Sequence, residues 1–201
     1  MARGRRSDHS RDEIAELIAA EGAQTIAADG LGAVSARELA RRIGYSVSTV
    51  LTVMGSTEAI VTAINTRTFS IWADALEERL ARDPDDRIAA LVGAYFEFAE
   101  RNRLLWMAIF EHKPILAGIP EDQAAVRARL TGIVVDEVRR ALPEDARDRA
   151  PALARSLIAT VHGHCYYALT GSFALMGEDD PRGAALDRVR ESIAAAAGRT
   201  R

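Results

Sequence analysis

The sequence SARELARRIGYSVSTVLTVM occupies Ser35–Met54 and has the pattern of two short helices joined by a tight turn. Ser35 and Glu38 have the spacing of a capping box, which satisfies free amides at the start of a helix. Gly44 can adopt the left-handed conformation that ends a helix at little steric cost. Ser46 is a suitable cap for a second helix, up to about Val53. We therefore predict a helix-turn-helix, whose second helix can enter a DNA major groove.

The rest of the chain is also predicted to be helical. Ser10 and Glu13 form a second capping box, and apolar residues at helical spacing follow it. Further apolar periodicities, each ended by proline, glycine or a polar turn, follow from residue 57 to residue 197. No segment has a convincing strand pattern. The sequence predicts an all-α protein of about nine helices, including one continuous helix from about Pro151 to Met176.

Composition restricts the class of protein. The chain has 201 residues, of which 48% are hydrophobic and 27% charged, with a formal net charge of -3. Residues 1–56 hold seven arginines and seven acidic residues, so a DNA-binding role is permitted there but not indicated by charge. A single cysteine excludes an internal disulfide and fits a reducing compartment. No apolar run approaches the roughly 20 residues of a membrane helix, so we expect a cytoplasmic protein without a membrane partner.

The region from Ser10 to about Ile64 resembles the DNA-binding module of TetR-like (tetracycline-repressor family) transcriptional regulators. The resemblance rests on Gly44-Tyr45-Ser46, Thr49-Val50-Leu51-Thr52-Val53-Met54 and Gly55-Ser56-Thr57-Glu58. It implies a helix-turn-helix domain at residues 10–56 with three helices, and a larger helical domain at 57–201 for ligand sensing and dimerisation. Residues 1–9 are expected to be a flexible basic arm, either a solvated tail or a source of DNA contacts through Arg3, Arg5 or Arg6.

The resemblance places the DNA contacts on the two helices of the helix-turn-helix. Arg37 is the best candidate for a base contact, because arginine pairs bidentately with a guanine edge. Leu51, Val53 and Thr57 replace the Tyr, His and Lys that bind phosphate in the family. Because phosphate contacts supply much of the affinity, we expect weaker and less salt-sensitive binding, with thymine methyl groups as possible contacts of Leu51 and Val53. The predicted DNA-binding residues are Ser35, Arg37, Tyr45, Val47, Ser48, Thr49, Leu51, Thr52 and Val53.

The eighth predicted helix carries two apolar stripes, which indicates that both of its sides are buried. One side can face its own subunit, and a second copy of the chain is the economical partner for the other. The resemblance also implies a homodimer through the last two helices. The predicted interface residues are Leu157, Val161, His164, Ala168 and Leu175 on the eighth helix and Val189 and Ile193 on the ninth.

Aromatic residues and histidine are spread over the fourth to eighth helices. Aromatic residues at helical spacing often belong to an ordinary core, and only the family resemblance turns this set into a pocket for a small hydrophobic effector. No cluster of charges indicates a more specific ligand. The predicted effector-binding residues are Trp72, Tyr95, Phe98, Trp106, Phe110, His162, Tyr166 and Phe173.

The expected function is ligand-responsive regulation of transcription, with repression through a palindromic operator as the main hypothesis. One alternative is a TetR-like scaffold that acts through protein partners. Another is a redox sensor based on Cys165, although a buried core thiol is the favoured interpretation of that residue. His162 and Cys165 share a helical face, but a metal site needs three or four converging ligands. We therefore expect no catalytic residue, metal or cofactor.

Overall fold

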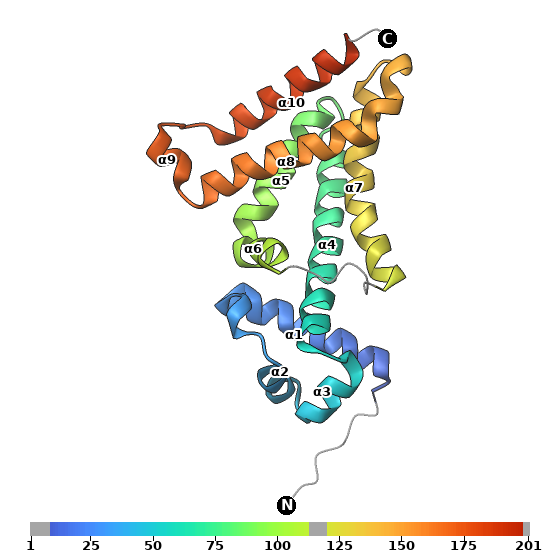
Figure 1. Cartoon of the computed structure of the whole chain (residues 1–201), viewed down its shortest axis with the longest axis vertical. Helices are drawn as coiled ribbons and strands as arrows, with labels where there is room; N and C mark the ends of the chain where they lie inside the picture. The colour runs from blue at the N-terminus through green and yellow to red at the C-terminus, as the bar shows by residue number, and fades with distance from the viewer. Residues whose placement is uncertain (1–8, 113–119, 199–201) are drawn as a thin grey trace, which may run out of the picture. The chain divides into compact units, whose positions relative to one another are not determined.

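A computed structural model describes residues 9–112 and 120–198 (Figure 1). This part of the chain contains ten α-helices and two short 3-10 helices and no strand, which confirms the predicted all-α fold. The helices are α1 (Arg11–Asp29), α2 (Ala36–Ile43), α3 (Val47–Met54), α4 (Thr57–Arg82), α5 (Arg87–Arg101), α6 (Arg103–Glu111), α7 (Glu121–Ala141), α8 (Ala150–Leu169), α9 (Ser172–Met176) and α10 (Pro181–Ala197), with η1 (Leu31–Ala33) and η3 (Glu144–Arg149).

The helices belong to two compact units. The first consists of the described parts of Met1–Thr68 and Leu104–Pro120, and the second of the described parts of Phe69–Arg103 and Glu121–Arg201. The helix α4 is therefore shared, with its first half in one unit and its second half in the other. The first unit also includes α6, which the sequence analysis placed in the sensing domain.

Serine caps fix the helix starts in the first unit. The Ser10 hydroxyl accepts a hydrogen bond from the Glu13 amide, and the Glu13 carboxylate accepts one from the Ser10 amide, so this predicted capping box is complete. Ser46 caps α3 by accepting from the Thr49 amide at 3.0 Å. Gly44 has φ 76° and ψ 25°, the left-handed conformation expected at the end of α2. The conformation of Gly44 and the cap at Ser46 set the turn between α2 and α3.

The core of the first unit is aliphatic. Leu39 of α2, Val50 of α3 and Ile64 of α4 are fully buried in one hydrophobic cluster. Gly22 of α1 lies against Ile64, so that a Cβ added at Gly22 would collide with Ile64 Cδ1. This close approach of α1 and α4 was not identified from the sequence, where Gly22 is an isolated glycine inside a helix.

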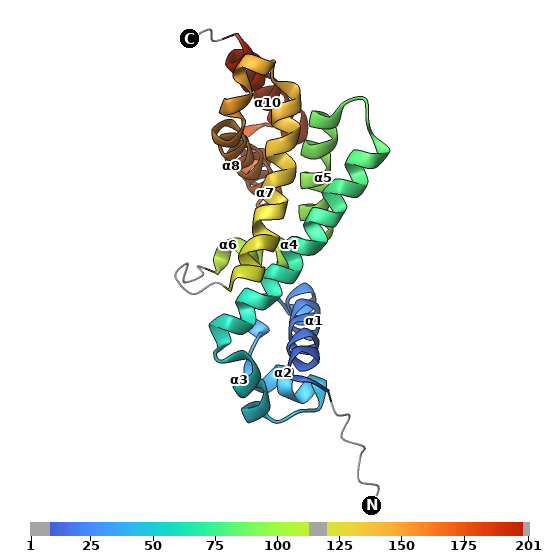
Figure 2. The ribbon, with the colours of Figure 1, turned by 90° about the vertical axis from the view of Figure 1, so that its right-hand side faces the viewer.

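The second unit is a helical bundle in which α8 packs against α7 and α10 (Figure 2). One ion pair in it is largely removed from water. Arg87, at the start of α5, donates to both carboxylate oxygens of Glu137 at 2.6 and 2.8 Å, and Glu137 is only 5% exposed. Arg87 also donates to the carbonyl of Leu80 in α4. The pair therefore joins α4, α5 and α7, and removal of Arg87 would leave the buried Glu137 with only Arg140, 3.4 Å away, as an ion-pair partner among the described residues.

The predicted continuous helix to Met176 is interrupted. The helix α8 ends at Leu169, and Gly171 has φ 79° and begins the separate short helix α9. A second glycine, Gly177 with φ 75°, ends α9. The apolar periodicity continues through the break, so periodicity did not reveal it. The positive φ at Gly171 is the physical reason why the described part has ten α-helices instead of about nine.

Candidate nucleic-acid interface and apolar cavity

The two helices of the helix-turn-helix present an exposed surface with an open hollow. This hollow of about 450 Å³ lies between them, and its lining includes Arg37 and Val47. Of the predicted DNA-binding residues, Tyr45, Thr49 and Val53 are half-buried, and Val53 packs against the hydrophobic core. The remaining six are exposed: Ser35, Arg37, Val47, Ser48, Leu51 and Thr52. Four of the predicted set, Ser35, Arg37, Tyr45 and Val47, line this hollow, and Tyr45 packs against the hydrophobic core as Val53 does.

Three hydroxyl groups cluster at the start of α3. The Oγ of Ser46 lies 2.7 Å from the Oγ of Ser48 and 2.8 Å from the Oγ1 of Thr49. It also accepts from the Thr49 amide. These hydroxyls fix the first turn of α3, which carries the exposed Val47 and Ser48.

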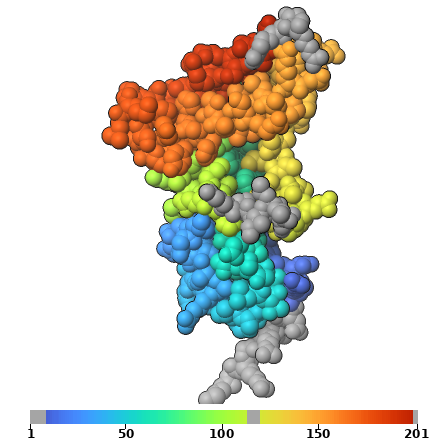
Figure 3. All heavy atoms as spheres, in the orientation of Figure 1, coloured from blue at the N-terminus to red at the C-terminus, as the bar shows by residue number. Residues whose placement is uncertain are grey.

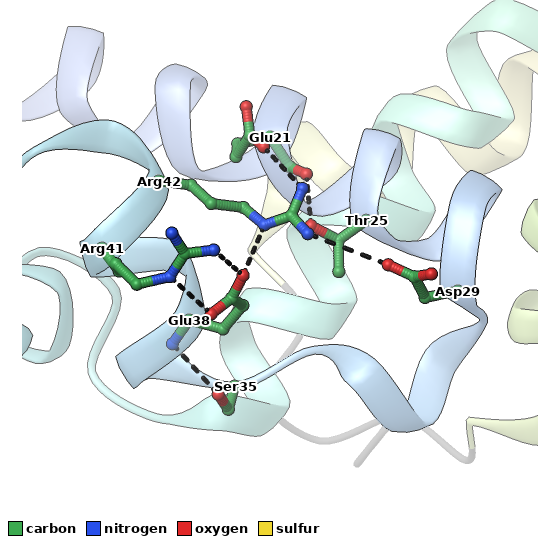
Figure 4. A network of polar contacts seen from close by, with 7 residues as sticks. All are labelled: Glu21, Thr25, Asp29, Ser35, Glu38, Arg41 and Arg42. Carbon is green, nitrogen blue, oxygen red and sulfur yellow. Dashed lines mark hydrogen bonds and ion pairs between the residues drawn. The ribbon is translucent and has the colours of Figure 1, made fainter.

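The carboxylate of Glu38 organises a network on α2 (Figure 4). It accepts from Arg41 Nη2 at 2.6 Å and from Arg42 Nε at 2.7 Å. These two guanidinium groups lower the pKa of Glu38 to about 2. Arg42 also donates to Glu21 and lies 3.8 Å from Asp29, so the network ties α2 to α1.

This network changes two expectations from the sequence. Ser35 caps α2 by accepting from the Glu38 amide at 3.1 Å, but the Glu38 carboxylate is bound to Arg41 and Arg42 instead of returning a hydrogen bond to Ser35. The predicted capping box is therefore half formed. Two of the three arginines of α2 are also compensated, and Arg37 forms no ion pair with any described residue. Arg37 is thus the uncompensated cation of α2.

The start of α1 is bound to the helix-turn-helix by two contacts that sequence reasoning missed. His9 Nδ1 lies 2.7 Å from the hydroxyl of Tyr45. Arg11 donates to the carbonyl of Val53 near the end of α3, at 3.1 Å. A cation suits that position because the carbonyl end of a helix carries partial negative charge. Arg3, Arg5 and Arg6, proposed as DNA contacts of the arm, lie outside the described residues.

The second unit contains an apolar cavity. Its volume is about 50 Å³, enough for a few small groups, since one water requires roughly 10–15 Å³. Its walls are aliphatic except for Tyr95. The lining residues are Leu76, Ile88, Leu91, Val92, Tyr95, Val134, Val138, Leu157, Ile158, Val161 and Val189.

Four predicted effector-binding residues form one aromatic group beside this cavity. Trp72 stacks on Phe98 with ring centroids 5.0 Å apart and meets Tyr95 edge-on at 4.8 Å. The Tyr95 hydroxyl lies 3.0 Å from Nδ1 of His162. Burial lowers the pKa of His162, which favours its neutral form. The indole Nε1 of Trp72 is buried and has no hydrogen-bond acceptor among the described residues.

Of the other four, only Tyr166 is near this group, with its ring centroid 6.1 Å from that of His162. Trp106 and Phe110 pack edge-on in α6, which belongs to the first unit. Tyr166 is 38% exposed on α8, and Phe173 of α9 packs against other aromatic rings. Of the eight predicted residues, only Tyr95 lines the cavity. The family resemblance grouped residues that the fold distributes over separate environments, and their assignment to an effector stays a prediction.

The predicted dimer residues also divide. Leu157, Val161 and Val189 are at most 6% exposed in the single chain and line the cavity of their own subunit, and Ile193 is 9% exposed. His164 and Ala168 are half-buried, whereas Leu175 is 92% exposed. Both stripes of α8 were apolar, and periodicity could not show which one faces inward. The space-filling view shows α8 at the surface along its length (Figure 3).

Cys165 is fully buried, and burial raises the pKa of its thiol to about 12. The reactive thiolate is therefore disfavoured at neutral pH. Among the residues the structure describes, no group of three or more His, Cys, Asp or Glu side chains could hold a metal ion. No single helix in the same part of the chain is both long and apolar enough to cross a membrane.

The sequence of residues 88–193 matches the family described as "Tetracyclin repressor-like, C-terminal domain". The match covers more than half of the 201 residues. The chain belongs to this family. The match lies in the C-terminal part, whereas the resemblance found from the sequence was carried by the N-terminal helix-turn-helix, so the TetR-like assignment has support from both ends of the chain. No curated protein sequence matches the chain.

Solved structures share the TetR-like fold. A protein of unknown function from Rhodococcus sp. RHA1 has a TM-score of 0.72 and 22% identity over 96% of this chain and 99% of its own. A putative TetR-family transcription regulator from Shewanella sp. PV-4 has a TM-score of 0.60 and 16% identity over 90% and 96%. The TetR-family regulator PfmR from Thermus thermophilus has a TM-score of 0.53 and 21% identity over 92% and 99%. At these identities the likeness concerns the fold.

Proposed function

We propose that this TetR-like protein is a DNA-binding transcriptional regulator. The observation that supports this most is the geometry of the helix-turn-helix: α3 is capped, held on α2 by the buried Val50, and exposed where Val47, Ser48 and Thr52 lie. The uncompensated Arg37 stands on the same open hollow as Val47. Such a surface can enter a major groove with Arg37 available for a guanine edge.

The regulator acts as a homodimer. The outward face of α8 carries the exposed Ala159 and, one turn later, the half-buried Gly163, with the exposed Tyr166 and Tyr167 beyond. Small residues allow a second helix to approach closely, and the tyrosines offer contact area at the end of the stripe. Two copies paired by a two-fold axis would place two recognition helices in successive major grooves, roughly 34–36 Å apart on a near-palindromic site.

A small molecule bound in the second unit controls this dimer. The apolar cavity and its aromatic neighbours are the proposed effector site. In one conformation of the dimer, the spacing of the two recognition helices does not fit DNA. An effector that binds this conformation more tightly than the DNA-binding one shifts the dimer toward it and releases the operator. The result is repression that the effector relieves, in the cytoplasm, where the protein has access to DNA.

The test is selection of random duplex DNA by the purified full-length protein, followed by affinity measurements over a salt series. The expected outcome is an enriched palindrome with a shallow dependence on salt, because Leu51, Val53 and Thr57 supply no charge to phosphates. Absence of any enrichment at low salt, repeated after addition of cell extracts as a source of a co-repressor, would contradict DNA binding. It would favour the alternative of a scaffold that acts through protein partners.

A further inference from the structure

Arg127 of α7 is a cation without a counter-ion among the described residues. Its guanidinium lies over the ring of Phe69 in α4, with Cζ 5.3 Å from the ring centroid. Its Nε–H is buried and has no acceptor, and the residue forms no ion pair with any described side chain. Desolvation lowers the pKa of this arginine, in keeping with an environment poor in compensating charge.

The neighbouring acidic residues of α4 do not supply that charge. Asp74 and Glu77 both bind Arg129, whose Nη2 lies 2.8 Å from the former and 2.6 Å from the latter. Arg129 therefore satisfies the acids of the α4–α7 contact, and Arg127, two residues earlier, is left with the face of an aromatic ring. A buried N–H without an acceptor costs free energy, which an anionic ligand would recover.

Arg127 is also aligned with the apolar cavity. Val134 and Val138 follow it at seven and eleven residues along α7, which places all three on one face of the helix. Leu76 follows Phe69 by seven residues on α4 in the same way, and Leu76, Val134 and Val138 all line the cavity. Seven residues of helix span about 10 Å, so the guanidinium and the cavity stand about that far apart along both helices.

A second buried hydrogen-bond donor without a described acceptor lies on α4 between the position of Arg127 and the cavity. Trp72, one turn after Phe69 and one turn before Leu76, has a buried Nε1–H without an acceptor among the described residues. Its ring meets that of Tyr95, which lines the cavity. Along α4, a ligand would therefore meet the Arg127 cation beside Phe69 first, then the N–H of Trp72, and then the aliphatic wall of the cavity at Leu76. This order is the one that an amphiphilic anion would match.

We propose that the protein binds an aliphatic carboxylate, whose carboxylate group pairs with Arg127 and whose chain follows α4 and α7 into the cavity at Leu76, Val134 and Val138. The role of such a molecule as the effector rests on the regulatory function proposed above, whereas its binding to this site is independent of that function. The proposal refines the small hydrophobic effector predicted from the sequence. No charge cluster in the sequence indicated it, because a lone arginine in a helix is usually paired or solvated.

The experiment measures binding of straight-chain carboxylates, from butyrate to dodecanoate, and of the alcohols of equal length to the full-length protein by calorimetry. Carboxylates should bind more tightly than the matching alcohols. Arg127→Gln should weaken carboxylate binding about tenfold or more, because a charge-assisted hydrogen bond is lost, and should leave the alcohols within about twofold. Arg147→Gln, which alters an exposed arginine of η3, is the matched control and should change neither.

A second variant tests the cavity. Val134→Phe should reduce the longest chain that binds while preserving the preference for carboxylates, and circular dichroism verifies that each variant is folded. Equal affinity for acids and alcohols, equal effects of the two arginine variants, or no binding of any carboxylate would each overturn the proposal. Selection of duplex DNA is performed without ligand, so failure of the carboxylate proposal and failure of DNA binding are separate outcomes.

Discussion

The guanidinium of Arg42 in α2 donates a 3.2 Å hydrogen bond to the carboxylate of Glu21 in α1 while its Nε donates to Glu38 within its own helix. The side chain of Arg42 thus orients α2 on α1. Its own charge and that of Glu38 compensate each other on the helix that carries Arg37. The electrostatic character of the proposed DNA interface depends on this relationship, because Glu38 holds both Arg41 and Arg42.

Glu38→Gln should therefore increase affinity for DNA at low salt. Loss of the carboxylate leaves the charge of Arg41 available to phosphates, whereas Arg42 keeps Glu21 and Asp29 as partners. The slope of log affinity against log salt should steepen by about 0.9 for each phosphate newly neutralised, as measured by fluorescence anisotropy over a salt series. Asp136→Asn is the control, because it removes an acid paired three residues away with Arg139 in α7. An equal slope in the two variants would show that Arg41 does not reach phosphate.

Arg37→Ala should relax specificity at one base pair in each half-site. The expected loss of discrimination there is about 1–3 kcal/mol, while other positions keep theirs. Affinities for the selected operator and for each single-base variant measure it. Arg41→Ala, one turn later and already paired with Glu38, should change affinity little and uniformly across sequences. A uniform loss for Arg37→Ala as well would assign that residue to phosphate instead of a base.

Local signals in the sequence predicted much of the first unit. Serine at a helix start and glycine at a helix end act through the backbone of adjacent residues, so Ser10, Gly44 and Ser46 could be assigned without knowledge of the tertiary structure. Only half of the predicted Ser35–Glu38 capping box forms. The Glu38 carboxylate binds Arg41 and Arg42, which follow it by three and four residues, instead of the Ser35 amide. A pattern match does not rank such competitors.

The candidate sites depend on packing, which the sequence pattern leaves undetermined. Leu157 and Val161 read as an interface stripe, yet they line the cavity of their own subunit. Arg127 gave no signal, because its significance arises from Phe69, 58 positions earlier, and from the engagement of nearby acids by Arg129. Helical periodicity identifies which residues share a face but not what covers that face.

The outward face of α8 provides the test of the proposed homodimer. Ala159→Arg should convert the dimer into monomers at micromolar concentration, because a long cation cannot be accommodated where two helices approach closely. Sedimentation velocity measures this. Ala141→Arg at the exposed end of α7 is the control and should leave the mass unchanged. If Ala159→Arg also remains dimeric, the two chains associate through another surface. Loss of operator binding together with loss of the dimer would link the interface to DNA recognition.

The last prediction concerns Cys165 and the redox alternative. Burial raises the pKa of its thiol from the ordinary value of 9.0 to about 12, so the native protein disfavours the thiolate. The unfolded chain ionises this thiol first as pH rises, so the stability of the native state should fall between about pH 9 and 12.

At pH 8 the native protein should react with a thiol reagent far more slowly than the denatured protein. Cys165→Ala should retain operator affinity, should weaken the pH dependence of stability in this range, and should cost about 1 kcal/mol of unfolding free energy through the lost packing of one buried sulfur. Rapid labelling of the folded protein, or operator binding that changes on oxidation in the parent and not in Cys165→Ala, would instead establish a redox sensor.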